Sequence, residues 1–185
     1  MSSLNTKSIF TFCSQPGARG FLGPLGPILQ SQGWKQFHTS LGFNGATHSC
    51  EQSIIEAFDA TSPDVLVTSI GRNSLEKMLL NRANELGIPS FHIFDAWYDY
   101  IPRIMQTFGD VAVPKKIIVI DKFAADEMIA AGISENKLVI CGHPAWEQIQ
   151  FSPPNDMRHK ILVVDQIFSL EGGKTKLGFD EVQFF

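Results

Sequence analysis

The residues best suited to chemistry cluster in one short stretch where aromatic and charged side chains alternate. The stretch follows a predicted strand, Ser90–Phe94, and comprises Asp95, Trp97, Tyr98, Asp99, Tyr100 and Arg103. An aromatic face can stack on a sugar or a base, and a nearby carboxylate can accept hydroxyl protons or act as a general base. We therefore take Asp95 as the candidate catalytic residue, and Trp97 and Arg103 as candidate binding residues. The alternative is a surface loop whose aromatic side chains pack at the domain edge.

A second candidate site is the glycine-rich stretch after the first predicted strand, Ser8–Cys13. A turn of this kind can bring backbone N–H groups up to a phosphate or a sugar. The spacing of its glycines fits neither a dinucleotide-binding GxGxxG motif nor a Walker GxxxxGK[ST] motif, which argues against an NAD enzyme. A tight turn without a ligand is therefore an equal alternative. Within the stretch, Gly17 and Gly20 are candidate backbone contacts, and the guanidinium of Arg19 is suited to an anion.

His143, in the sequence Gly142-His143-Pro144, follows the last predicted strand. It could contact a phosphate or act as a base, or it could simply belong to a turn that glycine and proline fix. His92 lies inside a predicted strand, where a core histidine with a hydrogen-bond partner is the expectation, and Asp121 is expected to cap a helix. The histidines show no pairing at metal-ligand spacing, so we predict neither a metal site nor a cofactor.

Short apolar runs that alternate with helical patterns must position these candidates. Strands that are apolar throughout are typical of a parallel sheet buried on both faces. Right-handed crossovers then predict an α/β fold, a Rossmann-like, doubly wound, mostly parallel sheet with helices on both faces. The strand candidates are Ser8–Cys13, Phe37–Leu41, Val65–Ile70, Ser90–Phe94, Lys116–Ile120 and Lys137–Cys141. The helix candidates begin near residues 25, 50, 75 and 122.

The chain divides into a domain and a shorter tail. We expect a Rossmann-like domain over residues 1–148, a proline-containing linker over 149–159, and a remnant of a second domain over 160–185. The remnant begins with the apolar strand Lys160–Asp165 and continues to the start of a helix. Two elements cannot bury a core of their own. We therefore expect residues 160–185 to dock on the first domain, to self-associate or to contact a partner chain.

Composition narrows the class of protein. The net charge is −4 and no run of Lys or Arg stands out, which argues against nucleic acid or an anionic membrane as a partner. The three cysteines are an odd number without CxxC spacing, which predicts reduced and mostly buried thiols. The polar N-terminus matches neither a signal peptide nor a transmembrane segment, so we expect a cytoplasmic protein.

The order and spacing of these segments resemble the N-terminal domain of GT-B glycosyltransferases and of the related UDP-GlcNAc 2-epimerases. The resemblance spans residues 8–146 and is carried by Ser14–Gly20, Pro63–Ser69, Asp95–Tyr98 and Cys141–Trp146. It implies the acceptor-side half of a glycosyltransferase-like enzyme of glycan or nucleotide-sugar metabolism, truncated early in its second domain. Its partner would be a sugar acceptor or a nucleotide-sugar.

The GT-B resemblance also sets a limit on activity. The donor nucleotide usually binds the C-terminal domain of such enzymes, and this sequence holds little of that domain. Catalysis would therefore require a second domain. The alternative function is a non-catalytic, Rossmann-like module for ligand binding or protein interaction.

Overall fold

The central feature of the structure is a six-stranded parallel sheet. A computed structural model describes residues 6–14, 16–40, 51–69, 74–95, 97, 100–107 and 114–147. The strand order is β2-β1-β3-β4-β5-β6, and every neighbouring pair is parallel. This arrangement confirms the predicted α/β, Rossmann-like fold. The strands are β1 (Ser8–Cys13), β2 (Lys35–Ser40), β3 (Val65–Ser69), β4 (Ser90–Phe94), β5 (Lys116–Val119) and β6 (Leu138–Ile140).

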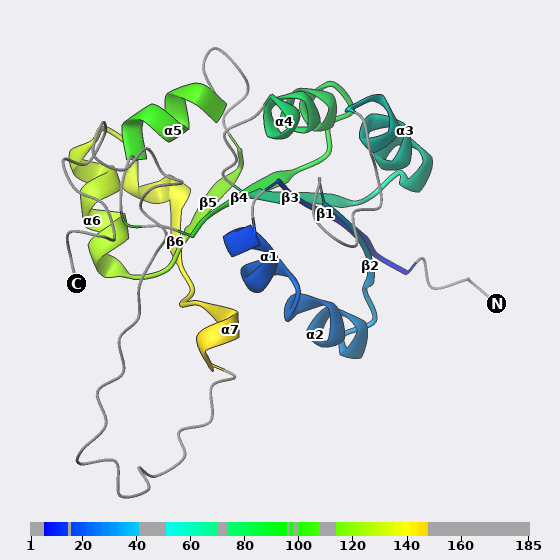
Figure 1. Ribbon diagram of the computed structural model, residues 1–185, viewed down its shortest axis with the longest axis horizontal. Coiled ribbons are helices and arrows are strands. Elements are labelled where there is room, and N and C mark those ends of the chain that lie inside the picture. Colours follow the sequence, from blue (N-terminus) through cyan, green and yellow to red (C-terminus); the bar gives the residue numbers. More distant parts are fainter. Residues whose placement is uncertain are drawn as a thin grey trace, which may run out of the picture. The chain divides into compact units, whose positions relative to one another are not determined.

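Helices cover both faces of the sheet (Figure 1). One face packs against α1 (Pro16–Leu22) and α2 (Leu25–Ser31), which connect β1 to β2. The other face packs against α3 (Glu51–Thr61), α4 (Leu75–Glu85), α5 (Tyr100–Thr107) and α6 (Lys122–Ala130). A short 3-10 helix, η1 (Glu135–Lys137), precedes β6, and α7 (Pro144–Glu147) follows it and contacts α1.

The inner strands β1, β3 and β4 are mainly apolar because both of their faces are buried. Phe10 and Phe12 of β1 pack on the side of α3 and α4, whereas Ile9 and Cys13 of the same strand pack on the side of α1. On the first side Phe58 meets Phe10 edge to face, with ring centroids 5.2 Å apart. The two cores explain why alternation between polar and apolar residues is missing from the strand sequences.

The predicted helix ends agree with the structure where backbone chemistry determines them. Gly87 and Gly132 have φ angles of 70° and 94°, a region that favours glycine. Each lies immediately after the C-cap residue of its helix, α4 or α6. Asp121 caps α6, as expected: its side chain accepts a hydrogen bond of 2.8 Å from the backbone N–H of Ala124.

The glycine-rich turn expected after β1 is wrong. Gly17 and Gly20 lie inside helix α1, which begins at Pro16, so the connection from β1 consists only of residues 14 and 15. Proline suits this first helical position because its φ is already helical and its missing N–H would have had no partner there. Helix packing, rather than glycine flexibility, therefore sets the backbone of this stretch, and Gly20 is exposed.

Three smaller expectations also differ from the structure. Strand β2 begins at Lys35, two residues before the predicted start at Phe37, because it pairs with β1 from Ser8 onward. The helical spacing of apolar residues predicts that Leu86 is buried together with the apolar face of α4. In the structure Leu86 is 48% exposed, because the helix has already ended. Cys141 is exposed, whereas Cys13 is buried as expected.

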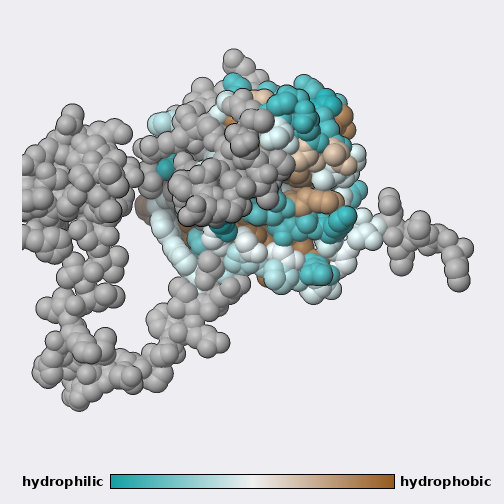
Figure 2. Space-filling view, turned by 45° about the vertical axis from the view of Figure 1, so that its right-hand side comes forward, coloured by the Kyte–Doolittle hydropathy of each residue, from teal (hydrophilic) through white to brown (hydrophobic). Residues whose placement is uncertain are grey.

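On the face shown in Figure 2, hydrophobic residues form small patches between hydrophilic ones. None of the helices in the described ranges is both long and apolar enough to span a membrane. The predicted linker and second-domain remnant, and also Cys50, Tyr98 and Asp99, lie outside the described residues.

Candidate functional site

The candidate site lies at the carboxyl edge of the sheet, the side on which all six parallel strands end. Strand order reverses between β1 and β3, because the chain moves outward from β1 to β2 and returns to β3 on the other side. Ligands of open α/β sheets bind outside the strand ends near such a reversal. Ser14 follows β1 directly, Asp95 follows β4 directly, and His143 follows β6 after two residues. Residues distant in sequence therefore meet at this edge.

Asp95 has the electrostatic surroundings of a functional carboxyl group. Burial raises its pKa, because a charged carboxylate is costly to desolvate. Its own backbone N–H and the nearby charges of Arg103 and His143 act in the opposite direction. Arg103 is itself buried in α5, with its guanidinium carbon 5.9 Å from the ring centroid of Phe94. A partly desolvated carboxyl near a guanidinium and an imidazole can bind a hydroxyl group or exchange a proton.

The Cys13 thiol shows that Arg19 also belongs to this neighbourhood. Burial raises the pKa of Cys13 to about 11. The charge of Arg19 opposes this shift, whereas the charges of Glu76 and Asp95 add to it. The thiol at the end of β1 therefore has one guanidinium and two carboxyl groups around it. A pKa this high makes Cys13 an inert core thiol rather than a nucleophile.

Aromatic rings connect the end of β6 to the loop after β4. The indoles of Trp97 and Trp146 stack at 5.4 Å with an interplanar angle of 23°, and Trp146 also stacks on His143 at 4.5 Å and 9°. His143 meets Phe21 of α1 edge to face at 5.1 Å. The indole Nε1 of Trp97 donates a 2.8 Å hydrogen bond to Asp121. Both indoles remain partly exposed, Trp97 by 40% and Trp146 by 49%.

Glu76 is a polar residue of this edge that the sequence analysis did not assign to the site. It is fully buried in the first turn of α4, and the hydroxyl of Ser14 donates a hydrogen bond to its Oε1 atom. Its Oε2 atom is also buried and has no hydrogen-bond partner. Burial raises the pKa of Glu76 to about 7, against the opposing effect of its hydrogen bonds with Ser14 and with the backbone. The sequence offers Asn73 or Ser74 as the cap of this helix, and the structure has Ser74 at the N-cap position.

Most of the predicted site residues come together. Arg103 and His143 act on the charge of Asp95, Arg19 acts with Asp95 on Cys13, and Trp97 joins His143 through Trp146. Gly17 and Gly20 are placed on α1, the same helix as Arg19. The sequence could have indicated that Trp146 contacts His143, because the two residues are three positions apart, which is helical spacing.

His92 is a core residue, as expected, and takes no part in the edge. Its ring is fully buried in β4, and its Nδ1 atom lies 2.6 Å from the hydroxyl of Thr68 in β3. Burial lowers the pKa of His92 to about 3, so the ring is neutral at physiological pH. A neutral imidazole with a hydroxyl partner suits the interior of a sheet.

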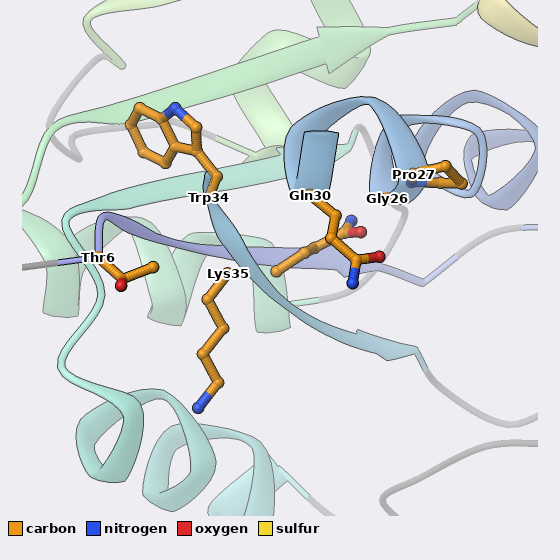
Figure 3. Close-up of a pocket in the computed structure, with 7 residues that line it drawn as sticks. Thr6, Gly26, Pro27, Gln30, Trp34 and Lys35 are labelled. Carbon is orange, nitrogen blue, oxygen red and sulfur yellow. The ribbon is translucent and has the colours of Figure 1, made fainter. Parts of the chain in front are cut away.

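One pocket of the described residues lies away from this edge. It measures about 600 Å³ and lies beside α2 and the amino ends of β1 and β2, opposite the carboxyl edge. In Figure 3, the side chains of Trp34 and Lys35 point away from each other. The pocket therefore gathers no convergent chemistry. Its lining residues are Thr6, Gly26, Pro27, Gln30, Trp34, Lys35 and Gln36. Among the residues that the structure describes, no three His, Cys, Asp or Glu side chains are grouped as metal ligands.

Comparison with known proteins assigns the fold. No family model matches the sequence, and no curated protein is similar enough to match it. Several solved structures do match, and two of them each have a TM-score of 0.57. A complex of S. aureus MnaA with UDP is 16% identical over 82% of this chain and 49% of its own chain. UDP-N-acetylglucosamine 2-epimerase from Rickettsia bellii is 14% identical over 77% of this chain and 46% of its own.

These similarities define the class of fold. The described domain shares its Rossmann-like α/β fold with these solved structures. The chain spans about half the length of the solved structures that it matches. At these low identities the likeness concerns the fold alone.

Proposed function

We propose that this chain is the acceptor-side half of a glycosyltransferase-like GT-B enzyme that acts in glycan or nucleotide-sugar metabolism. The observation that carries the proposal is the environment of Asp95. Its partly desolvated carboxyl lies at the carboxyl end of β4, with Arg103 and His143 close enough to act on its charge. The fold shared with nucleotide-sugar enzymes supports the same class of ligand.

Each residue has a role in this proposal. Asp95 accepts the proton of a sugar hydroxyl, as a hydrogen-bond acceptor or as a general base. Arg19 and Arg103 supply positive charge for phosphate oxygens, and α1, with Gly17 and Gly20, places Arg19 beside the strand ends. Trp97 offers a partly exposed ring face to a sugar. His143 donates to a phosphate or exchanges a proton.

A non-catalytic ligand-binding or interaction module is the second candidate. The observation in its favour is the packing of Trp97, whose indole is stacked on Trp146 and hydrogen bonded to Asp121. An indole fixed by a stacked ring and by a hydrogen bond can pack the edge of a domain as well as it can bind a sugar. The two candidates differ in turnover and not in the position of the site.

Binding to the purified chain tests the proposal. UDP, UDP-GlcNAc and free GlcNAc would each be titrated by calorimetry, with thermal shift as a second measurement. A ligand at a hundred times its dissociation constant adds about 2.7 kcal/mol to the stability of the folded form. Because the ligand of an acceptor-side half would be a sugar acceptor or a nucleotide-sugar, we expect free GlcNAc or UDP-GlcNAc to bind. Asp95→Asn should weaken that binding by roughly tenfold or more, which corresponds to about 1.4 kcal/mol.

The matched control is Asp126→Asn, because this exposed carboxylate belongs to α6 and pairs with Lys122 at 2.6 Å. It should leave binding unchanged. Absence of binding by every probe, or equal binding by wild type and Asp95→Asn, would contradict the proposal. Because catalysis would require a second domain, turnover of the nucleotide-sugar, followed by proton NMR, separates the two candidates only in a chain that a second domain completes.

A further inference from the structure

The pair formed by Ser14 and Glu76 occupies the most favourable position of the carboxyl edge. Ser14 is the first residue after β1, and Glu76 is the second residue of α4, the helix that follows β3. Strands β1 and β3 are neighbours, and the strand order reverses between them. The pair therefore lies where doubly wound sheets bind their ligands. Neither residue has a role in the function proposed above.

Glu76 is too costly to be explained by packing alone. A carboxyl group loses its hydration when it is fully buried, and an apolar residue would fill the same position without that cost. Only its Oε1 atom receives a side-chain hydrogen bond, which comes from Ser14. Its Oε2 atom is buried and has no hydrogen-bond partner among the described residues. Such a group in a native core calls for a specific explanation.

The direction of the hydrogen bond provides this explanation. A serine hydroxyl has one proton to donate and two lone pairs that can accept. Because Ser14 donates its proton to Glu76, its Oγ atom can offer only lone pairs to any other group. Ser14 is half-buried, so this oxygen is closer to solvent than the carboxyl group that holds its proton. When its carboxyl group is ionised, Glu76 thereby makes Ser14 a hydrogen-bond acceptor only.

The pair is also adjacent to the rest of the candidate site. Cys13, which precedes Ser14 in the chain, responds to the charges of Glu76, Asp95 and Arg19. Both carboxyl groups are therefore close to one thiol at the end of β1. A ligand that reaches Asp95 would meet the Ser14 oxygen on the side of the strand reversal.

We propose that Ser14 Oγ is a subsite for a hydroxyl group of the bound sugar, and that Glu76 is its positioning residue. The inference rests on the proposed function in one respect, namely that the ligand carries sugar hydroxyl groups. The subsite takes O–H or N–H donors. It rejects an analogue that lacks the hydroxyl, because the Ser14 oxygen then loses its partner.

Calorimetry with deoxy sugars tests this subsite in the full chain. The probes are UDP-GlcNAc and UDP-sugar analogues that each lack one hydroxyl group of the GlcNAc ring. We expect the wild type to bind one of these analogues roughly tenfold more weakly than UDP-GlcNAc, the effect of one lost hydrogen bond. Ser14→Ala should bind UDP-GlcNAc as weakly as the wild type binds that analogue, and should no longer distinguish the two ligands.

Two further variants examine the role of Glu76. Glu76→Gln can turn its amide N–H₂ toward Ser14, which frees the serine proton, so discrimination between the two ligands should fall. Ser14→Thr keeps the hydroxyl and should keep the discrimination. Ser31→Ala is the matched control, because this exposed serine donates only to the backbone oxygen of Ile28 in α2. If Ser14→Ala fails to fold, Glu76→Gln provides the same comparison.

The outcomes separate this inference from the proposed function. If Asp95→Asn weakens binding but Ser14→Ala and Glu76→Gln discriminate as the wild type does, the subsite is wrong and the proposed function stands. If the wild type binds no probe, the proposed function is overturned and the subsite with it. Loss of discrimination in Ser14→Ala alone supports the subsite but removes the role of Glu76.

Discussion

The substitution Glu76→Gln should make the protein more stable in alkaline solution and change little in acid. Glutamine has nearly the same shape as glutamate and carries no charge. Its side-chain amide can keep a hydrogen bond with Ser14 in either orientation. The difference between the two proteins therefore isolates the cost of ionising a carboxyl group that is fully buried in the first turn of α4.

The magnitude follows from the pKa of Glu76, which burial raises from 4.5 to about 7. The folded protein holds this proton more tightly than the unfolded chain does, so protonation favours the folded state. The contribution is fully present below pH 4.5 and is lost as the pH rises from 4.5 to 7. A difference of this size corresponds to about 3 kcal/mol. The neighbouring groups are the Ser14 hydroxyl and the Cys13 thiol, and neither ionises in this range.

The assay is urea denaturation of wild type and Glu76→Gln at several pH values between 4.5 and 8.5. We expect the stability of the variant relative to wild type to increase by about 3 kcal/mol across this range, with most of the change below pH 7. Glu85→Gln is the matched control, because Glu85 is an exposed residue of the same helix. A difference between Glu76→Gln and wild type that stays constant with pH would refute the reasoning.

Two further substitutions test the local structure by urea denaturation. Asp121→Ala should lower the free energy of unfolding by about 1 kcal/mol, because it removes the side-chain acceptor of the Ala124 N–H. Asp121→Asn should retain most of that stability. An equal loss in both variants would contradict the capping role. A Cβ atom at Gly26 would lie 2.7 Å from Gln36 Oε1. Gly26→Ala should therefore destabilise the wild type but stabilise a Gln36→Ala background by roughly 0.5–1 kcal/mol. The same effect in both backgrounds would show that the contact with Gln36 does not matter.

The strands were predictable because a single physical cause determines their sequences. A strand buried on both faces must be apolar along its whole length, and β1 and β4 have the predicted bounds for this reason. The position of Asp95 followed in the same way, since the first residue after a parallel strand lies at the carboxyl edge. Strand β2 was less clear because it is the edge strand and carries the polar residues Gln36, His38 and Thr39.

The features that sequence could not reveal depend on contacts between distant segments. Nothing in the residues around Glu76 indicates that its carboxyl group meets Ser14, because the fold alone brings the ends of β1 and β3 together. The glycines of α1 suggested a turn because glycine has a low helix propensity. In the structure the packing of Phe21 and Leu22 outweighs this propensity and holds the helix in place. The stack between Trp97 and Trp146 likewise depends on the fold, which brings α7 next to the residue that follows the end of β4.

The stacked indoles give the molecule an optical property of its own. Of the three tryptophans in the chain, Trp97 and Trp146 lie 5.4 Å apart, whereas Trp34 has the ammonium group of Lys7 over its ring, 5.4 Å from the centroid. Two indoles at this separation couple their electronic transitions. Replacing Trp34 with phenylalanine would leave this coupled pair as the indole emitters. Near-ultraviolet dichroism and fluorescence of that variant would then report directly on the geometry around His143 and the loop after β4.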